Sequence, residues 1–238
     1  MRFDIITIFP KIFDSYLRES LFKRAQKKNL LEIKIHNLRD FSADRHKKVD
    51  DRPFGGGPGM VFKIEPIYRA VCEFASYKFI SSQKKLINLK TYKLKTRIIL
   101  FSTRGKKLDA KIAKRLSKYN QLILICGRYE GVDERVAKYV ADEEISVGDY
   151  VLSGGELPAL VLIEAVSRFL PGFLGKSGSL EEIKGSYPAY TRPEVFSPKK
   201  NSDAQGSRSP DRKRRGWAAP KVLLSGDHKK IEKWRRQI

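Results

Sequence analysis

The sequence predicts an α/β fold built on a largely parallel sheet. Short β-branched apolar runs alternate with stretches whose apolar residues recur at helical spacing. In the clearest unit, buried strands at 97–101 and 121–125 flank a helix at 108–116. Strands that are separated by helices are typical of a parallel sheet. With 41% hydrophobic residues, the 238-residue chain can bury one substantial core and a small second domain.

The other expected elements continue this alternation. They are strands at 3–9, 31–35 and 143–147, and helices at 10–26, at 65–77, from about 133, and at 156–170. In parallel sheets, ligands bind beyond the carboxyl ends of the strands. Three glycine-bearing loops follow strands in this sequence, and we expect the chemistry there.

Charge points to a polyanionic partner. The chain has 49 Lys and Arg against 27 Asp and Glu, a net charge of +22. Nucleic acid is the commonest partner of such a surface, because each neutralised phosphate releases a counterion. The alternative is a solvated basic surface without a specific partner, and charge alone favours nucleic acid by only roughly two to one.

Cysteine usage and the N-terminus indicate the compartment. Cys72 and Cys126 lie in apolar surroundings, which predicts buried free thiols in a reducing environment. The Cys and His residues have no zinc-ligand spacing. The first residues include Asp4 and Pro10 and do not resemble a signal peptide, and no stretch is apolar for long enough to span a membrane. We therefore expect a cytoplasmic protein that is not in a membrane.

Composition changes near the C-terminus. Residues 176–238 hold 16 Lys and Arg against 7 Asp and Glu. Within them, 198–216 is rich in Ser, Pro, Gly and charge, which predicts a disordered linker or insertion. Amphipathic helical character returns at 221–238, where Ile231 and Trp234 are three residues apart. We expect a main domain at 1–172, a linker at 173–197 and a C-terminal region at 198–238.

The first candidate motif is the glycine-rich stretch DDRPFGGGPGM at 50–60. Four Gly and two Pro exclude a helix or a central strand. The stretch is neither a P-loop nor a dinucleotide fingerprint, because the required spacing is absent. Glycine content alone fits a flexible surface loop equally well. A dense polar cluster beside it favours a site: Asp44, Arg45, His46, Asp50, Asp51 and Arg52.

Two further motifs follow predicted strands. ICGRYEGVDERV at 125–136 leads from a buried strand into a helix, and its backbone groups suit hydrogen bonds to a purine edge, although a structural corner would look similar. EISVGDYVLSGGELPALVLIEAVSR spans 144–168. Glu156 would lie at a helix N-terminus, where a carboxylate is favoured and where it could simply be a cap. Arg168 lies in an apolar helix, so it is either paired or faces a site.

Taken together and in this order, these stretches resemble the bacterial tRNA (guanine-N1)-methyltransferases of the TrmD type, in the SPOUT superfamily. LRDFSADRHKKVDDRPFGGGPGM, ICGRYEGVDERV and EISVGDYVLSGGELPA carry the resemblance, with FDIITIFP, AVSRFLPG, YTRPEVF and VLLSGDH elsewhere. The matches span nearly the whole chain. The longest of them are too long and unusual to arise by chance.

The resemblance implies a fold and a function. The fold is a SPOUT-type parallel sheet with a deep trefoil knot that holds S-adenosylmethionine, and a small, mostly helical C-terminal domain that grips tRNA. The protein would be a homodimer with active sites at the subunit interface. It would methylate N1 of guanosine at tRNA position 37, next to the anticodon. The family is also associated with Mg²⁺, but no ligand cluster in this sequence indicates a site.

The expected catalytic residues are Arg168, Glu182 and Asp50. A base must remove the guanine N1 proton and a cation must stabilise charge near O6. The resemblance assigns Arg168 as the cation and places Asp50 beside the target base or the dimer interface. Ile183 stands where the family usually has an acidic residue, so the neighbouring Glu182, or Glu181, is the expected base.

The resemblance also assigns the cofactor contacts. They carry over onto Leu100, Phe101, Ser102, Gly127, Tyr129, Glu130, Gly131, Val147, Gly148, Tyr150, Leu152, Gly154, Gly155 and Pro158. Three departures from the family pattern stand beside them: the linker before YTRPEVF is several residues short, the basic insertion at 198–216 is atypical, and Thr103 replaces a usual Pro.

Two other interpretations remain at this point. A SPOUT ribose 2′-O-methyltransferase would share the knot and the cofactor, but would have other loops in place of GGGPGM and GDYVLSGGE. A non-catalytic basic RNA-binding protein would use the glycine loops only structurally and would not bind S-adenosylmethionine. Thermal stabilisation by that cofactor separates this last interpretation from both enzymes.

Overall fold

A computed structural model describes residues 1–75, 95–174, 186–197 and 217–236, which belong to two compact units, Met1–Ser179 and Leu180–Ile238. The first unit contains a five-stranded sheet in the order β2-β1-β6-β5-β7, with every neighbouring pair parallel. Its strands are β1 (Arg2–Thr7), β2 (Glu32–Asn37), β5 (Thr96–Lys107), β6 (Gln121–Ile125) and β7 (Glu143–Ser146). The predicted parallel α/β sheet is confirmed.

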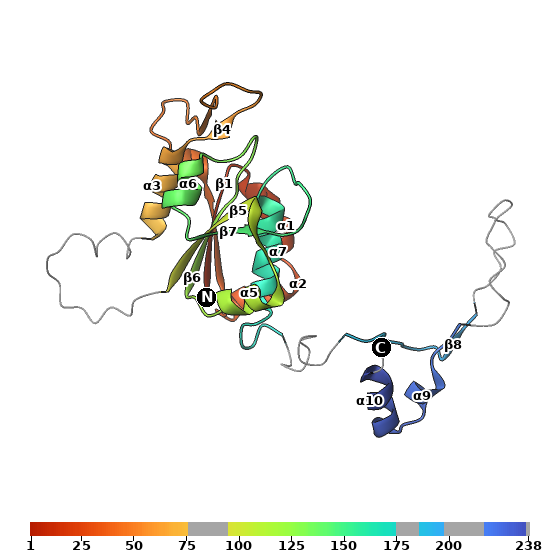
Figure 1. Ribbon diagram of the computed structural model, residues 1–238. Helices are drawn as coiled ribbons and strands as arrows, with labels where there is room; N and C mark the ends of the chain where they lie inside the picture. The colour runs from red at the N-terminus through yellow and green to blue at the C-terminus, as the bar shows by residue number, and fades with distance from the viewer. Residues whose placement is uncertain (76–94, 175–185, 198–216, 237–238) are drawn as a thin grey trace, which may run out of the picture. The chain divides into compact units, whose positions relative to one another are not determined.

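Helices cover both faces of this sheet. Helices α1, α2, α5 and α7 lie on one side, and α3 and α6 lie on the other (Figure 1). Alternate residues of β1 face the two sides, so Phe3 and Ile5 belong to one core and Ile6 to the second. The helices in the described part of this unit are η1 (Pro10–Phe13), α1 (Asp14–Leu17), α2 (Ser20–Lys27), η2 (Leu38–Phe41), α3 (Ile64–Phe74), α5 (Ala110–Leu116), α6 (Glu134–Tyr139) and α7 (Glu156–Ser167).

The predicted single helix at 10–26 is wrong, because the chain forms η1, α1 and α2 there. Glu19 has an extended backbone and Ser20 has a φ of 46°, which breaks the helix between α1 and α2. Of the residues expected on one apolar face, Phe13 and Leu17 are buried in one core and Leu21 packs against it, whereas Ile12 and Tyr16 are exposed. An interrupted helix can keep part of the burial pattern of a continuous one when each piece packs on the same sheet face.

Strand β5 is longer than the predicted 97–101. It pairs with β6 through Leu100 and continues to Lys107 after an irregularity, because Phe101 and Lys106 both pair with Ile145 of β7. Gly105 allows this close approach, since a Cβ atom there would lie 2.5 Å from the backbone nitrogen of Ile145. The chain between Phe101 and Lys106 therefore leaves the regular ladder at the carboxyl end of the sheet.

Smaller differences concern element ends. Strand β6 coincides with the predicted 121–125, whereas α7 ends at Ser167 rather than 170. The helix predicted at 65–77 is α3, which ends at Phe74, and Tyr77 lies outside the described residues. Cys126 is buried as expected, but Cys72 is only half-buried because it lies near the end of α3; both are free thiols.

A short antiparallel pair, β3 (Asp50–Asp51) with β4 (Val61–Phe62), was not predicted. It closes the glycine-rich loop at its base. Two-residue strands leave no periodic pattern in a sequence, so this pairing depends on the tertiary fold.

The second unit is small. It contains β8 (Val195–Phe196) paired with β9 (Trp217–Ala218), followed by α9 (Lys221–Leu224) and α10 (His228–Arg236). The predicted helical character after residue 221 is thus present in two helices, and the Trp234 ring lies 6.3 Å from that of Tyr190. The predicted insertion at 198–216 lies outside the described residues. Across the described ranges, no helix has the length and apolar content to cross a membrane.

Candidate active site

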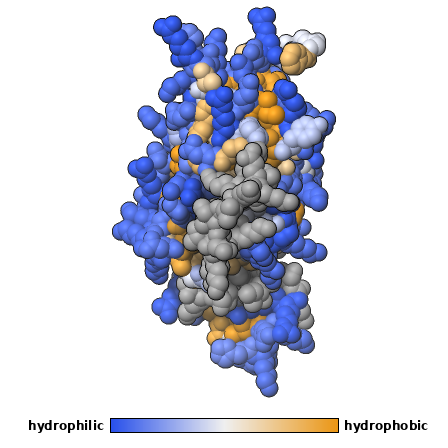
Figure 2. Space-filling view, turned by 90° about the vertical axis from the view of Figure 1, so that its left-hand side faces the viewer, coloured by the Kyte–Doolittle hydropathy of each residue, from blue (hydrophilic) through white to orange (hydrophobic). Residues whose placement is uncertain are grey.

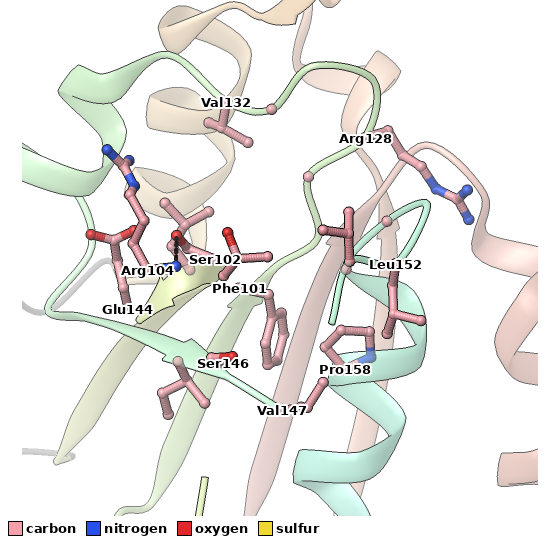
Figure 3. A pocket seen from close by; sticks show the side chains of 18 of the residues that line it. Phe101, Ser102, Arg104, Arg128, Val132, Glu144, Ser146, Val147, Leu152 and Pro158 are labelled. Atoms are coloured by element: carbon pink, nitrogen blue, oxygen red, sulfur yellow. Dashed lines mark hydrogen bonds between the residues drawn. The ribbon is translucent and has the colours of Figure 1, made fainter. Parts of the chain in front are cut away.

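A cavity of about 560 Å³ lies beyond the carboxyl ends of β5, β6 and β7. Its walls come from these strand ends, from the loops that follow them, and from the first turn of α7 (Figure 3). This is where parallel sheets bind ligands, and the volume is typical of a small-molecule site.

The cavity gathers all fourteen residues that the sequence suggested for a cofactor. They are Leu100, Phe101, Ser102, Gly127, Tyr129, Glu130, Gly131, Val147, Gly148, Tyr150, Leu152, Gly154, Gly155 and Pro158. These residues come from three separate motifs and converge only in the folded chain. That they contact a cofactor stays a prediction.

Of the three expected catalytic residues, the two that the structure describes, Arg168 and Asp50, do not line this cavity. Arg168 follows the last residue of α7, whose twelve residues place it roughly 18 Å along the helix from the cavity end. Asp50 is half-buried in β3. Glu182 and its neighbour Glu181 lie outside the described residues. A single chain therefore assembles the candidate cofactor site without Arg168.

The loop after β6 has a strained backbone. Tyr129 has a φ of 60° and Gly131 a φ of 119°, and for a tyrosine such a φ is unusual. The Tyr129 ring packs edge-on against Phe62, at 5.6 Å between centroids, and the Glu130 amide donates to the Met60 carbonyl at 3.1 Å. Strain of this kind is often found at functional sites. The contacts dock the loop against the end of the glycine-rich stretch.

The turn before α7 packs against the end of β6 without space for side chains. The Gly155 amide donates to the Gly127 carbonyl at 2.9 Å, and a Cβ atom on Gly155 would lie 2.6 Å from Cys126 Cα. A Cβ atom on Gly148 would lie 2.2 Å from the Tyr150 ring. Glycine is therefore required at position 155 by close packing against the backbone of β6, and the glycine turns bring backbone groups to the cavity wall.

Sequence reasoning missed several charged residues of the site. Arg128, Arg104, Glu134 and Glu144 line the cavity, although Arg128 belongs to the quoted CGRYEG motif. Arg104 donates to Glu134 at 2.7 Å, and this hydrogen bond raises the pKa of the guanidinium. One oxygen of Glu144 is buried without a hydrogen-bond partner in the described part of the chain. Arg104, Glu134 and Glu144 lie in β5, α6 and β7, and no local sequence pattern shows that these elements meet at one cavity.

Glu156 lies at the start of α7, as predicted, and it is buried. No side-chain capping hydrogen bond forms there, however. The carboxylate instead accepts hydrogen bonds from Arg128 Nε at 2.9 Å and from Thr7 Oγ1 at 2.7 Å. Its role as a simple cap is therefore wrong, because its partners are on other elements.

A parallel sheet covered by helices on both faces, with a glycine-lined cavity at its carboxyl edge, defines an α/β protein of the nucleotide-cofactor-binding class. Comparison with known proteins gives the family. The family described as tRNA (Guanine-1)-methyltransferase TrmD matches residues 1–238, and the chain belongs to this methyltransferase family.

Individual relatives agree over the full length. Three proteins named tRNA (guanine-N(1)-)-methyltransferase are similar to the whole chain over 242 aligned positions. The relative from Geotalea uraniireducens is 45% identical, with 85% of its length covered. Those from Clostridioides difficile and Ruminiclostridium cellulolyticum are 44% and 46% identical, with 91% and 90% covered.

Proposed function

We propose that this protein transfers the methyl group of S-adenosylmethionine to N1 of the guanosine at tRNA position 37, beside the anticodon, in the cytoplasm. One observation carries the proposal: fourteen residues that the family resemblance assigns to the cofactor all line one cavity. The cavity also lies at the edge where parallel sheets bind ligands.

The cavity wall suits an adenosine-containing cofactor. Phe101, Leu152 and Pro158 offer apolar surface for a purine ring (Figure 3). The glycine turns at 127–131 and 148–155 bring backbone N–H and C=O groups to hydrogen-bond the ring edge. When bound, S-adenosylmethionine supplies an electrophilic methyl group.

The chemistry needs a base and a cation. Guanine N1 carries a proton at neutral pH, so a base must remove it as the methyl group arrives. We assign this role to Glu182, with Glu181 as the adjacent alternative, and we assign Arg168 to stabilise negative charge at O6. Burial, with the nearby Glu156 carboxylate, raises the pKa of the Cys126 thiol, which disfavours a cysteine nucleophile.

We infer that the complete active site forms between two copies of the chain. Arg168 is too far along α7 to reach the cavity of its own chain. Helices α1 and α7 lie side by side, since Tyr16 donates to Glu164 at 3.0 Å. Exposed apolar side chains lie just before η1 and on η1, α1 and α7: Phe9, Ile12, Tyr16, Leu157 and Val161, hereafter the α7 face. Exposed apolar side chains on neighbouring elements are typical of a protein interface.

The trefoil knot belongs to the same proposal. It is supported by the close passage of the turn before α7 against Cys126 and by the second pairing of β5 with β7 beyond Phe101. Periodic patterns cannot identify a knot, because they report burial and not the path of the chain.

The C-terminal region would bind tRNA. We keep 1–172 as the methyltransferase domain, 173–197 as the linker and 198–238 as the tRNA-binding region. Helix α10 supports this role, because it carries Lys229, Lys230, Lys233, Arg235 and Arg236. Basic side chains on one short helix suit contacts to phosphates.

Magnesium has no assigned place in this proposal. Among the described residues, no group of three or more His, Cys, Asp or Glu could hold a metal ion. The donor set in this part of the chain therefore does not fit a preformed Mg²⁺ site, and we derive no step through the ion.

The test is methyl transfer from labelled S-adenosylmethionine to unmodified tRNA with guanosine at position 37. We expect N1-methylguanosine as the product, and no transfer to the same tRNA with adenosine there. Arg168→Gln should lower kcat by about 10²-fold or more, because it removes charge stabilisation in the transition state. Arg24→Gln, a change of the same kind on the exposed surface of α2, should not.

Glu182→Gln and Glu181→Gln, compared in parallel, identify the base. The assigned base should be the variant that loses kcat and still binds cofactor. A 2′-O-methylated product, or cofactor binding without any transfer to this tRNA, would contradict the proposed function.

A further inference from the structure

A buried carboxylate lies directly behind the cofactor cavity. Glu156 is 1% exposed and does not line the cavity, whereas Gly155 and Pro158 on either side of it do. Each of its oxygens accepts one hydrogen bond: Oε1 from Thr7 Oγ1 at 2.7 Å and Oε2 from Arg128 Nε at 2.9 Å. The three side chains come from the end of β1, the loop after β6 and the first turn of α7.

The network extends on both sides of Glu156. The Thr7 hydroxyl also accepts the Phe9 amide at 2.9 Å. Arg128 Nη1 donates to the Ser153 carbonyl at 3.2 Å, and its guanidinium lies over the Phe9 ring, 4.9 Å from the centroid. The Arg128 side chain extends away from Ser102 and Arg104 (Figure 3). Arg128 thus lines the cavity near its backbone while its charged end is held elsewhere.

Backbone contacts join the two glycine loops along a narrow seam. Gly155 donates to Gly127, and Arg128 forms an isolated antiparallel bridge with Gly154. A Cβ atom on Gly154 would lie 2.3 Å from Arg128 Nε. The loops therefore meet through glycine backbone, and the Arg128 side chain links them across the seam through its hydrogen bonds to Glu156 and Ser153.

Because Glu156 is buried, its stability depends on the correct placement of its two hydrogen-bond donors, Arg128 and Thr7. A carboxylate that is out of water is costly unless it is paired and hydrogen-bonded. The N-terminus of α7 adds a favourable dipole, but the two donors must still be in place. If the seam opens, Glu156 loses the Arg128 partner while most of its burial remains. The closed arrangement of the two loops is therefore strongly favoured.

We propose that Glu156 is a positioning residue of the cofactor site, which holds the loop at 127–131 against the turn at 152–155 through Arg128 and Thr7. The inference rests on the proposed function, since it concerns the same cavity. Without the carboxylate, a smaller fraction of the protein has the loops in the binding-competent arrangement. The observed dissociation constant rises in inverse proportion to that fraction.

The experiment is isothermal titration calorimetry of the full-length protein with S-adenosylhomocysteine, together with thermal unfolding. Glu156→Gln should bind about tenfold more weakly, because the charge-assisted hydrogen bond to Arg128 is lost. Thr7→Val, nearly isosteric, should also weaken binding, and Thr7→Ser should restore what Thr7→Val loses. In the transfer assay, Glu156→Gln should raise the KM for S-adenosylmethionine more than it lowers kcat.

Asp4→Asn is the matched control. Asp4 is a fully buried, ion-paired carboxylate on the same strand as Thr7, and it does not line the cavity. The control should lower thermal stability and leave the dissociation constant unchanged. Equal weakening of binding in Asp4→Asn and Glu156→Gln would overturn the proposal, because general destabilisation would then explain both.

Three further outcomes distinguish failure of the positioning role from failure of the proposed function. A folded Glu156→Gln with the wild-type dissociation constant overturns the positioning role and leaves the proposed function intact, provided that the wild type binds. If Glu156→Gln does not fold, Thr7→Val decides, and unchanged binding there overturns the proposal. A wild type that binds no cofactor overturns the proposed function and this inference with it.

Discussion

Among the described residues of the first unit, Asp4 is the buried carboxylate with the most hydrogen bonds. It is fully buried on β1 and accepts from Arg2 Nε at 2.7 Å, from His36 Nε2 at 2.9 Å and from Gln121 Nε2 at 2.7 Å. Burial alone would raise the pKa of Asp4. The hydrogen bonds from His36, Arg2 and Gln121 outweigh it and hold the pKa below the ordinary 3.8. The folded protein therefore favours the charged form more than the unfolded chain does.

This network predicts a pH-dependent contribution to stability. Because the folded pKa is the lower one, the stabilisation is complete above the unfolded pKa of 3.8 and is lost as pH falls through the folded value. At pH 7, Asp4→Asn should lower the free energy of unfolding by about 1–2 kcal/mol, since it removes the charge that accepts the Arg2 hydrogen bonds while the Arg2 side chain stays 34% exposed to water. The difference from wild type should shrink below pH 4 in urea denaturation. A difference that stays constant to pH 3 would contradict this account.

Single residues also show the limit of sequence reasoning. Glycine turns and a carboxylate at a helix start were visible in the sequence, and the structure brings them to one cavity. Arg128 was not selected, because a charged loop residue ordinarily faces water. Its partner Glu156 follows it by 28 positions, and no local pattern indicates an ion pair at that separation.

At the scale of elements, the sequence predicts best those strands and helices that are determined by their own residues, and it predicts poorly those that depend on contacts with other elements. Strand β6 (QLILI) is buried at every position, and its nearly continuous apolar run predicts a buried strand directly. The second half of β5 (STRGKK) is polar, and it is a strand only because it pairs with β7. The break at Ser20 was missed for the reverse reason, since apolar spacing continues through it. Strand pairing and helix breaks of this kind depend on residues that are neighbours in the folded structure and not in the sequence.

The seam between β6 and α7 gives a prediction at this scale. Gly155 has an ordinary φ of −81°, so backbone preference does not require glycine there. A Cβ atom would nevertheless lie 2.6 Å from Cys126 Cα, so Gly155→Ala must push the start of α7 away from β6. We expect a lower melting temperature and a loss of S-adenosylhomocysteine affinity, measured by calorimetry.

Gly226→Ala is the control for that substitution. Gly226 has a φ of 71° and nothing within 4 Å of its added Cβ, so only local backbone strain of about 1 kcal/mol is expected. Cofactor affinity should not change. If both variants bind alike, close packing at the seam does not shape the cavity.

At the scale of the whole molecule, charge and apolar surface are distributed differently. The chain carries +22, and hydrophilic side chains dominate the face shown in Figure 2 around the part drawn in grey. Such a surface suits a polyanion. The α7 face belongs to the layer of α1, α2, α5 and α7, on the other side of the sheet from α3 and α6. In this layer Leu157 and Val161 are exposed on α7, the helix that Tyr16 of α1 contacts through Glu164. The sequence could indicate the charge, but an exposed helix face emerges only when the fold shows which residues remain uncovered.

The α7 face predicts the oligomeric state. The wild type should be a dimer by light scattering, and Val161→Arg should be a folded monomer, because a charge buried without a partner in an apolar interface is costly. Methyl transfer should be lost when the dimer dissociates, because Arg168 can then no longer reach the cavity of a second chain. Tyr139→Arg, at an 80% exposed aromatic residue of α6 on the other layer, should remain dimeric and active. An active wild-type monomer would contradict the shared site.

Hybrid dimers give the sharper form of this test. If Arg168 acts in the partner's cavity, an Arg168→Gln chain still has an intact cofactor cavity. A Gly155→Ala chain still has the catalytic Arg168. Each chain alone should form inactive dimers. Co-expressed with different tags and purified as the mixed species, the pair contains one cavity with both intact parts and should recover transfer. Recovery requires that the two residues act across the interface, because a site contained within one chain would be broken in both partners.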